Sequence, residues 1–302
     1  MLPPPHPDPL PQAGEGEISP AAPKSGASAG LTAKEAPPAE RGGAPEASLA
    51  REAGQRRQPM IVLFTDFGLA GPYTGQVKTV LHLAAPAVPV IDLFADAPSR
   101  NPRAAAYLLA AYAEWFPPRT VFLAVIDPGV GGARAPLIAA ADDRWFVGPE
   151  NGLFEIVMRR AVRTPRLWDI TWRPALLSAS FHGRDLFAPV AARLALGETP
   201  PGKLRDPAGL ERNDWPDDLA EIVYVDHYGN AMTGLRAGTI PAAARLRAGG
   251  REVPPARTFS AVPPGAAFWY ENSTGLAEIA VNGGRADAAL GLAIGSAVEI
   301  LA

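Results

Sequence analysis

Three short segments of the chain carry side chains that could hold and activate a water molecule. Asp127 and Arg134 stand at the two ends of a glycine-rich segment, and His182, one of only four histidines, precedes a glycine. A third acidic residue, Asp66, is followed by Phe67-Gly68. An enzyme needs a carboxylate, a guanidinium and an imidazole of this kind to orient a water molecule and to take its proton. The residue types therefore indicate a candidate catalytic group.

Each of the two carboxylates has a simpler interpretation beside the functional one. Asp66 follows the apolar run Ile61-Val62-Leu63-Phe64. At the carboxyl end of a strand it could accept hydrogen bonds from a ribose diol, or it could cap the next turn. Asp127 ends a second apolar run, and its glycine-rich turn would let the backbone approach a ligand. That turn lacks both the Lys-Ser/Thr of a phosphate-binding loop and the glycine spacing of the dinucleotide fingerprint.

The two cationic candidates also have alternatives. Arg134 could pair with Asp127 or form a weak surface salt bridge. His182 could be a packed core residue, since it lies between Phe181 and a glycine at the start of an expected helix. Arg184 and Asp185 suit a structural pair at that helix start, where an acidic residue complements the helix dipole.

Polar candidates in the last third of the chain cluster in two turns. Asp226, Tyr228 and Asn230 could bind an ammonium group, an aromatic base and a polar group, or they could form an ordinary hairpin turn. His227 beside Asp226 suggests a metal ligand, but no third ligand lies near it in sequence. Ser273 belongs to a sequence that fits a glycosylation sequon or a polar turn.

The pattern of apolar runs predicts an α/β domain over residues 59–197. Strands alternate with helices, which implies a mainly parallel sheet covered on both faces. We expect strands at Met60–Thr65, Val88–Phe94 and Thr120–Ile126, a hairpin of Leu137–Ala141 with Arg144–Val147, and helices at Gly75–Ala84, Asn101–Trp115, Gly152–Arg160 and Gly183–Leu196.

The pattern changes after Gly197. Residues 198–218 are rich in Pro, Gly and Asp and are predicted to be a linker. Residues 219–302 contain short strands separated by Gly and Pro, which predicts a small all-β, barrel-like domain. We expect its strands at Ala220–Val225, Ala231–Leu235, Ala244–Leu246, Ala267–Tyr270, Gly275–Val281 and Ala297–Leu301.

Composition limits the remaining possibilities. Residues 1–58 contain no aromatic side chain, and we expect them to be disordered; alternatively, the true start is Met60. The net charge is −3 with no long basic run, which disfavours nucleic-acid binding. The chain has no cysteine and hence no thiolate nucleophile or disulfide. No secretory signal or apolar run long enough to span a bilayer is apparent, so we expect a cytoplasmic protein without membrane contact. The positive charges are almost all Arg, and Ala, Pro and Gly are abundant, which suggests a GC-rich bacterial genome.

Taken together, the motifs resemble the SAM hydroxide adenosyltransferase family, whose relatives include the SAM-dependent fluorinase and chlorinase. Matching segments occur in family order and span Met60 to Ala302. They are Thr65-Asp66-Phe67-Gly68, Val125 to Gly131, Arg134, Gly148-Pro149-Glu150-Asn151-Gly152-Leu153, Phe181-His182-Gly183-Arg184-Asp185, Asp226 to Asn230 and Asn272 to Asn282. Two segments depart from the pattern: Glu150 stands where Asp is usual, and Ala97 to Asn101 lacks the usual histidine.

The resemblance implies hydrolysis of S-adenosyl-L-methionine (SAM) to adenosine and L-methionine, with no metal or redox cofactor. It implies a homotrimer with each site between the N-terminal domain of one subunit and the C-terminal domain of its neighbour. The catalytic Asp–Arg–His trio maps onto Asp127, Arg134 and His182. The residues implied to bind substrate are Asp66, Asp226, Tyr228, Asn230, Ser273, Asn282 and Gly283.

The resemblance also leaves alternatives open. A halogenase would use a halide at the same ribose carbon, but the halogenating relatives lack the trio. A non-catalytic protein would bind SAM or adenosine without turnover. An unrelated α/β hydrolase is disfavoured because the chain has no Gly-x-Ser-x-Gly elbow.

Overall fold

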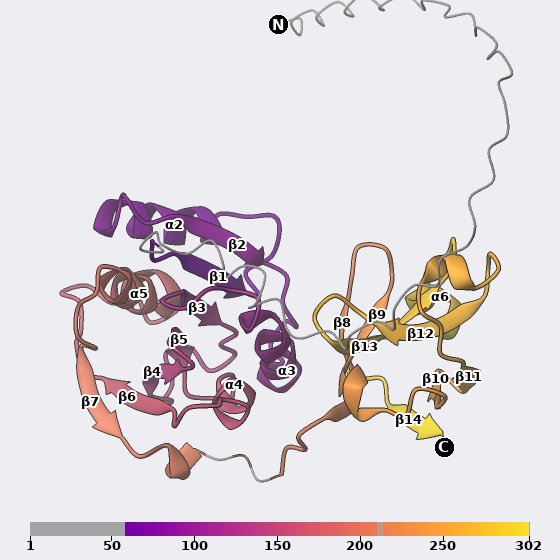
Figure 1. Cartoon of the computed structure of the whole chain (residues 1–302). Helices are drawn as coiled ribbons and strands as arrows, with labels where there is room; N and C mark the ends of the chain where they lie inside the picture. The colour runs from indigo at the N-terminus through magenta and orange to yellow at the C-terminus, as the bar shows by residue number, and fades with distance from the viewer. Residues whose placement is uncertain (1–57, 211, 213, 302) are drawn as a thin grey trace, which may run out of the picture. The chain divides into compact units, whose positions relative to one another are not determined.

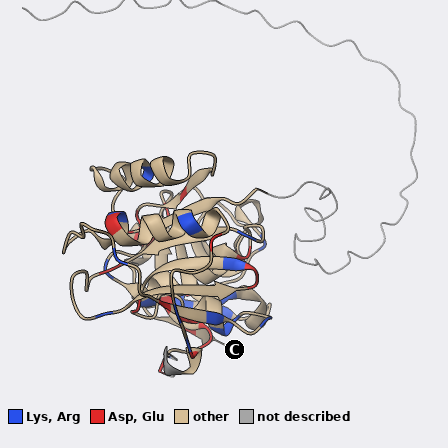
Figure 2. Cartoon of the chain, turned by 90° about the vertical axis from the view of Figure 1, so that its left-hand side faces the viewer, with Lys and Arg blue, Asp and Glu red and all other residues tan. Residues whose placement is uncertain are grey.

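The computed structural model describes residues 58–210, 212 and 214–301. Residues 1–57, which form nearly all of the tail predicted to be disordered, lie outside this range. Lys and Arg lie interspersed with Asp and Glu in the view of Figure 2. Among the described residues, no helix has the length and apolar character needed to cross a membrane.

The N-terminal domain is built around one seven-stranded sheet with the order β2-β1-β3-β5-β4-β6-β7 (Figure 1). The pairs β2–β1, β1–β3 and β3–β5 are parallel, whereas β5–β4, β4–β6 and β6–β7 are antiparallel. The sheet is therefore mixed, because β4 and β7 run opposite to the other strands. The strands are β1 (Ile61–Thr65), β2 (Val90–Phe94), β3 (Val121–Val125), β4 (Pro136–Ala141), β5 (Arg144–Pro149), β6 (Arg166–Ile170) and β7 (Gly202–Arg205).

Local sequence explains the centre of this sheet. Every residue of β1 and of β3 is buried, as expected for apolar strands covered on both faces. The β4–β5 turn is formed by Asp142 and Asp143, which have φ angles of 45° and 62°. Two consecutive positive φ angles are typical of the two-residue turns that match the twist of a hairpin.

Helices cover both faces of the sheet. α2 (Tyr73–Ala84) and α5 (Ala188–Ala195) share one apolar cluster with the strands, and α3 (Pro102–Ala113) and α4 (Glu155–Arg159) share another (Figure 1). The Asn101 side chain caps α3 by accepting a hydrogen bond of 3.0 Å from the backbone N–H of Ala104.

The C-terminal domain consists of two small antiparallel sheets with the orders β12-β13-β9-β8 and β11-β10-β14. Most of its buried apolar side chains belong to one apolar cluster. The elements are β8 (Leu219–Val225), β9 (Ala231–Arg236), β10 (Arg245–Ala248), β11 (Arg251–Val253), β12 (Ala267–Glu271), β13 (Leu276–Val281), α6 (Ala286–Leu290) and β14 (Val298–Leu301). The predicted architecture, an α/β domain followed by an all-β domain, is confirmed.

Among the described residues, three strands and one α-helix were not predicted: β6, β7, β11 and α6. β7 lies within the segment 198–218 that the sequence marks as a linker, and it pairs with β6 at the edge of the large sheet. Edge strands carry charges and border on prolines more often than central ones do, so their composition resembles that of a loop. The predicted helix from Gly183 begins instead as a π-helical turn, Gly183–Phe187, which continues into α5.

Candidate active site

The fold places the two candidate carboxylates side by side. β1 and β3 are parallel neighbours in register from Ile61↔Val121 to Thr65↔Val125. Asp66 and Asp127 follow these strands closely, so both lie at the same edge of the sheet. Ligands commonly bind at this edge in α/β folds, outside the carboxyl ends of the strands.

Asp127, Arg134 and His182 come together at this edge. Arg134 donates from Nε to Oδ1 of Asp127 at 3.0 Å and from its terminal nitrogen to Oδ2, which makes a two-pronged ion pair. The same terminal nitrogen lies 2.9 Å from Nδ1 of His182. The side chains of Arg134 and Asp127 are only 11% and 6% exposed. Arg134 also lies over the ring of Phe187, 5.3 Å from its centroid, so the guanidinium is held on several sides.

The glycine-rich turn between Asp127 and Arg134 makes room for a neighbouring loop. Gly131 has a φ of +78°, and a Cβ there would lie 2.4 Å from the carbonyl oxygen of Ala179. The loop containing Ala179 leads directly to His182. Glycine at this position therefore allows the two segments of the trio to approach each other, which is a structural reason for the turn.

The imidazole of His182 is held in one tautomer. A guanidinium only donates hydrogen bonds, so Nδ1 of His182 must accept the one from Arg134, and the proton of the neutral ring lies on Nε2. Burial lowers the pKa of His182, and the positive charge of Arg134 lowers it further. His182 is therefore neutral at neutral pH and can offer Nε2–H as a donor to a water oxygen.

Asp66 sits in a partly buried position close to this trio. Its Oδ2 accepts a hydrogen bond of 2.9 Å from the backbone N–H of Arg100. Burial raises the pKa of Asp66, and the negative charge of Asp127 adds to the rise. Arg100 belongs to the loop that departs from the family pattern, so that loop contacts a predicted substrate-binding residue directly.

A cavity of about 650 Å³ opens beside the trio and includes Arg134 and His182 in its lining. This volume is in the range of small-molecule sites. The lining also includes Arg173, which the sequence did not predict and whose charge contributes to lowering the pKa of His182. Arg173 follows β6, an unpredicted strand, so no pattern in the sequence could mark its position.

Most of the C-terminal candidates gather at one end of their sheet. Asp226 accepts from the backbone N–H of Asn230 at 2.8 Å and from its side-chain Nδ2 at 3.0 Å. These bonds hold the β8–β9 turn, on which Tyr228 is 73% exposed. The β9–β13 pairing of Ala231 with Ile279 brings Asn282, which follows β13, towards this turn.

Gly283 and Ser273 lie in two different turns. Gly283 is exposed, next to Asn282, whose Nδ2 donates to the carbonyl oxygen of Val262 at 2.7 Å. Ser273 is exposed in the turn before β13, whereas Asn282 follows that strand. Ser273 therefore lies at the opposite end of β13 from the other C-terminal candidates.

Within the described part of one chain, no hydrogen bond or ion pair joins the C-terminal candidates to the trio or to Asp66. In the same part of the chain, no group of three or more His, Asp or Glu side chains is arranged to hold a metal ion. The structure thus contains two separate clusters of predicted site residues, one on each domain.

Comparison with known proteins identifies the family. The model of the SAM hydroxide adenosyltransferase N-terminal domain matches residues 61–204, and that of the C-terminal domain matches residues 220–299. The chain belongs to the SAM hydroxide adenosyltransferase family. The resemblance inferred from the motifs is therefore confirmed, and both family domains lie in the order that the sequence predicts.

Individual relatives of the chain extend over the same region. A Thermus thermophilus protein named (R)-S-adenosyl-L-methionine hydrolase is 41% identical over 80% of this chain and 99% of its own length. A Salinispora arenicola protein of the same name is 38% identical over 81% of this chain and 98% of its own. A solved structure of an uncharacterized conserved protein from Thermotoga maritima has a TM-score of 0.73 and 31% identity, covering 80% of this chain and 100% of that one.

Proposed function

We propose that this protein hydrolyses S-adenosyl-L-methionine to adenosine and L-methionine by attack of water on the ribose C5′ carbon. The observation that carries the proposal is the buried ion pair of Asp127 and Arg134 in contact with His182. Family membership and the names of the relatives that span most of the chain support the same reaction.

The reaction requires activation of water rather than of the leaving group. The C5′–S bond breaks with its electron pair passing to sulfur, which leaves as the neutral thioether of methionine. Water has a pKa of about 15.7 in bulk, so the developing hydroxide needs stabilisation. Arg134 and the Nε2–H of His182 donate towards that oxygen, and Asp127 is the acceptor for the released proton. The second proton of the water remains on the new 5′-hydroxyl, and no metal or redox group is needed.

The charges in the transition state suit a site that excludes water. An oxygen that gains negative charge attacks a carbon attached to a positive sulfonium, so the reacting pair becomes less charged overall. A pocket of low dielectric strengthens the interactions of Arg134 and His182 with the nucleophile without having to hold a net charge.

Substrate recognition is proposed to involve both domains, from different subunits. Asp66 would accept hydrogen bonds from the ribose hydroxyls. Asp226 and Asn230 would bind the methionine end and the adenine, Tyr228 would stack on the base, and the turns with Ser273, Asn282 and Gly283 would complete the pocket. A homotrimer that pairs each trio with the C-terminal domain of a neighbour accounts for the separation of the two clusters within one chain.

The names of the relatives specify the configuration at sulfur, and we propose that this protein also takes the (R) sulfonium epimer. The test is incubation of the protein with each purified epimer of SAM, followed by separation of the nucleoside and amino-acid products. Equimolar adenosine and L-methionine from the (R) epimer are expected. Tight adenosine binding without turnover, or a 5′-halo-adenosine that forms only with added halide, would overturn the proposal.

A further inference from the structure

The turn Pro149–Gly152 replaces the end of the β3–β5 ladder. The parallel pairing of β3 and β5 is in register up to Leu123↔Val147. Beyond it, Pro149 has no N–H to donate. The backbone N–H of Glu150 turns away to the carbonyl oxygen of Ala135, at 2.9 Å. The strand leading to Asp127 therefore ends without the usual backbone donors from its neighbour.

The side chain of Asn151 supplies the missing donor. Its Nδ2 donates to the carbonyl oxygen of Ile126 at 2.8 Å, and its Oδ1 accepts from the backbone N–H of Leu153 at 3.3 Å. Ile126 is fully buried, so its carbonyl group would otherwise lack a partner in a place that water does not reach. The second bond fixes which way the amide faces.

The same turn holds both ends of the segment that carries the ion pair. Ile126 immediately precedes Asp127, and Ala135, which accepts from Glu150, immediately follows Arg134. A displacement of the turn would therefore move the carboxylate and the guanidinium together, and with them the contact to His182. Such a movement matters for catalysis, because a displacement of about 1 Å in a catalytic group can lower the rate about 10²-fold.

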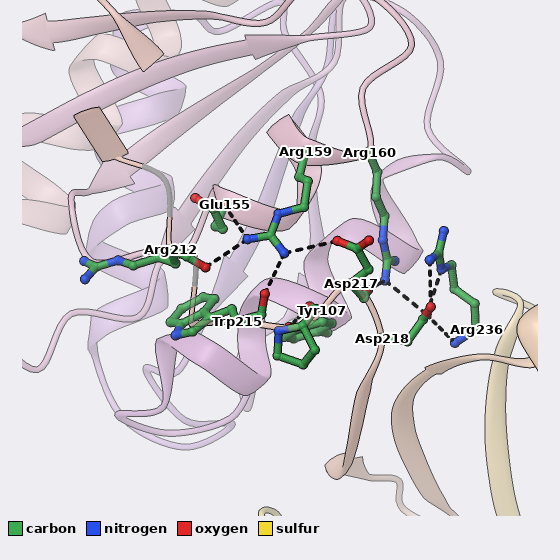
Figure 3. Close-up of polar contacts among 10 residues, drawn as sticks. Tyr107, Glu155, Arg159, Arg160, Arg212, Trp215, Asp217, Asp218 and Arg236 are labelled. Atoms are coloured by element: carbon green, nitrogen blue, oxygen red, sulfur yellow. Dashed lines mark hydrogen bonds and ion pairs between the residues drawn. The ribbon is translucent and has the colours of Figure 1, made fainter. Parts of the chain in front are cut away.

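The turn Pro149–Gly152 packs against the segment that joins the two domains. Gly152 has a φ of +93°, and a Cβ there would lie 2.5 Å from the ring of Trp215. Arg159 fixes this segment by donating to the carbonyl oxygens of Trp215 at 2.8 Å and of Arg212 at 3.0 Å (Figure 3). Glu150, the residue that departs from the family pattern, accepts a hydrogen bond of 2.8 Å from Arg205 of β7.

We propose that Asn151 is a positioning residue of the reaction, which holds the Asp127–Arg134 pair against His182 through the carbonyl group of Ile126. This inference rests on the proposed function for its kinetic meaning, but its structural content can be tested without turnover. Asn151 forms no hydrogen bond with the trio and does not line the cavity, so we expect its effect to pass through the backbone at Ile126.

The direct test is an NMR titration of the His182 imidazole in the full chain labelled at histidine, with His182→Asn used for assignment. The charged groups around this ring are Arg134, Asp127, Arg173 and Asp185. In Asn151→Ala and in Asn151→Asp, which keeps the shape but loses the donor, Arg134 should move away and the pKa of His182 should rise towards the ordinary value near 6.5.

Thr120→Val is the matched control, since Thr120 immediately precedes the first residue of β3, at the end of the strand away from Asp127, and is 1% exposed. Its hydroxyl donates to the carbonyl oxygen of Pro117 at 2.7 Å, far along the strand from the trio. This variant should lose stability but keep the wild-type pKa of His182. An unchanged pKa in both Asn151 variants, or an equal rise in Thr120→Val, would overturn the proposal.

The kinetic arm separates positioning from substrate binding. Both Asn151 variants should lose at least about tenfold in kcat while the adenosine Kd stays within about threefold of wild type. Wild-type kcat in either folded variant would overturn the positioning role. If the wild-type protein itself does not convert SAM, the proposed function fails, and the titration alone decides whether Asn151 holds the trio.

Discussion

At the scale of single residues, the most consequential feature is the guanidinium of Arg134. It is almost buried, it binds both oxygens of Asp127, and it fixes the tautomer of His182 by occupying Nδ1. A lysine could supply the charge but not the fork of donors that makes all of these contacts at once. Arg134 thus fixes the positions of both Asp127 and His182.

Replacement of Arg134 should therefore reduce turnover severely. Arg134→Ala leaves the buried Asp127 carboxylate without its partner and removes a donor to the nucleophile, so kcat should fall about 10²-fold or more. Arg134→Lys should recover only part of this loss. Steady-state kinetics with SAM measures both effects, and Arg247→Ala is the control because Arg247 pairs with Glu299 on the exposed face of β10. Near-wild-type rates in Arg134→Ala would remove this residue from the mechanism.

The lowered pKa of His182 predicts the pH dependence of turnover. The neutral ring accepts from Arg134, and protonation would place a proton on Nδ1, facing a cation. Activity should therefore be constant at neutral and alkaline pH and fall as the pH drops through the lowered pKa of His182.

Stability should depend on the same group. Because the folded pKa lies below the ordinary value near 6.5, the contribution of His182 to stability is present above that value and is lost as the pH falls through the folded pKa.

His182→Asn keeps an acceptor and a donor but does not titrate in this range. A kcat–pH profile whose acid limb is the same in this variant as in wild type would show that another group governs the limb.

At the scale of elements, the sequence predicts the strands from β1 to β5 well and misses β6 and β7 at one side of the large sheet. β1 and β3 are uninterrupted apolar runs, so their burial and the carboxylates that follow them could be anticipated. β6 carries Asp169, and β7 carries Lys203 and Arg205, so neither has a recognisable apolar pattern. The contact of Arg134 with His182 could be inferred only from the family resemblance, because it depends on how two distant loops pack at Gly131.

The substitution Gly148→Ala tests how closely β3 and β5 approach each other beside the site. A Cβ at this position would lie 2.1 Å from the carbonyl oxygen of Ala124, and a backbone atom cannot move aside cheaply. Gly148→Ala should therefore lower the free energy of unfolding by about 2 kcal/mol or more.

The control for this prediction lies in α2. A Cβ at Gly75 would meet no atom within 4 Å, so Gly75→Ala should raise the free energy of unfolding by roughly 0.5–1 kcal/mol through helix propensity. Denaturant unfolding of both variants gives the comparison. Equal stability of Gly148→Ala and wild type would mean that the two strands are further apart than described.

At the scale of the whole molecule, the predicted site residues form two clusters on different domains, and no hydrogen bond or ion pair joins the two clusters within the described residues. The trio belongs to the N-terminal domain, and Asp226, Tyr228 and Asn230 belong to a turn of the C-terminal domain. The sequence alone predicts both clusters but cannot place one against the other, since contacts between copies leave no periodic mark in a chain.

Mixing two inactive variants tests whether the sites are shared between subunits. Arg134→Ala has an intact C-terminal cluster, and Asp226→Ala has an intact trio. If each site combines two subunits, co-refolded equal mixtures should regain roughly a quarter of wild-type activity, because one pairing in four joins two intact halves. Native mass spectrometry of the mixture reports the number of subunits. No recovery in a mixture shown to contain mixed oligomers would contradict shared sites.

The most direct test of the reaction itself is turnover of SAM in water enriched in oxygen-18, with mass analysis of both products. Attack of water on C5′ places the label in the 5′-hydroxyl of adenosine and leaves the methionine unlabelled. We expect one labelled oxygen in each adenosine formed. Unlabelled adenosine, or label appearing in an amino-acid product, would contradict this mechanism.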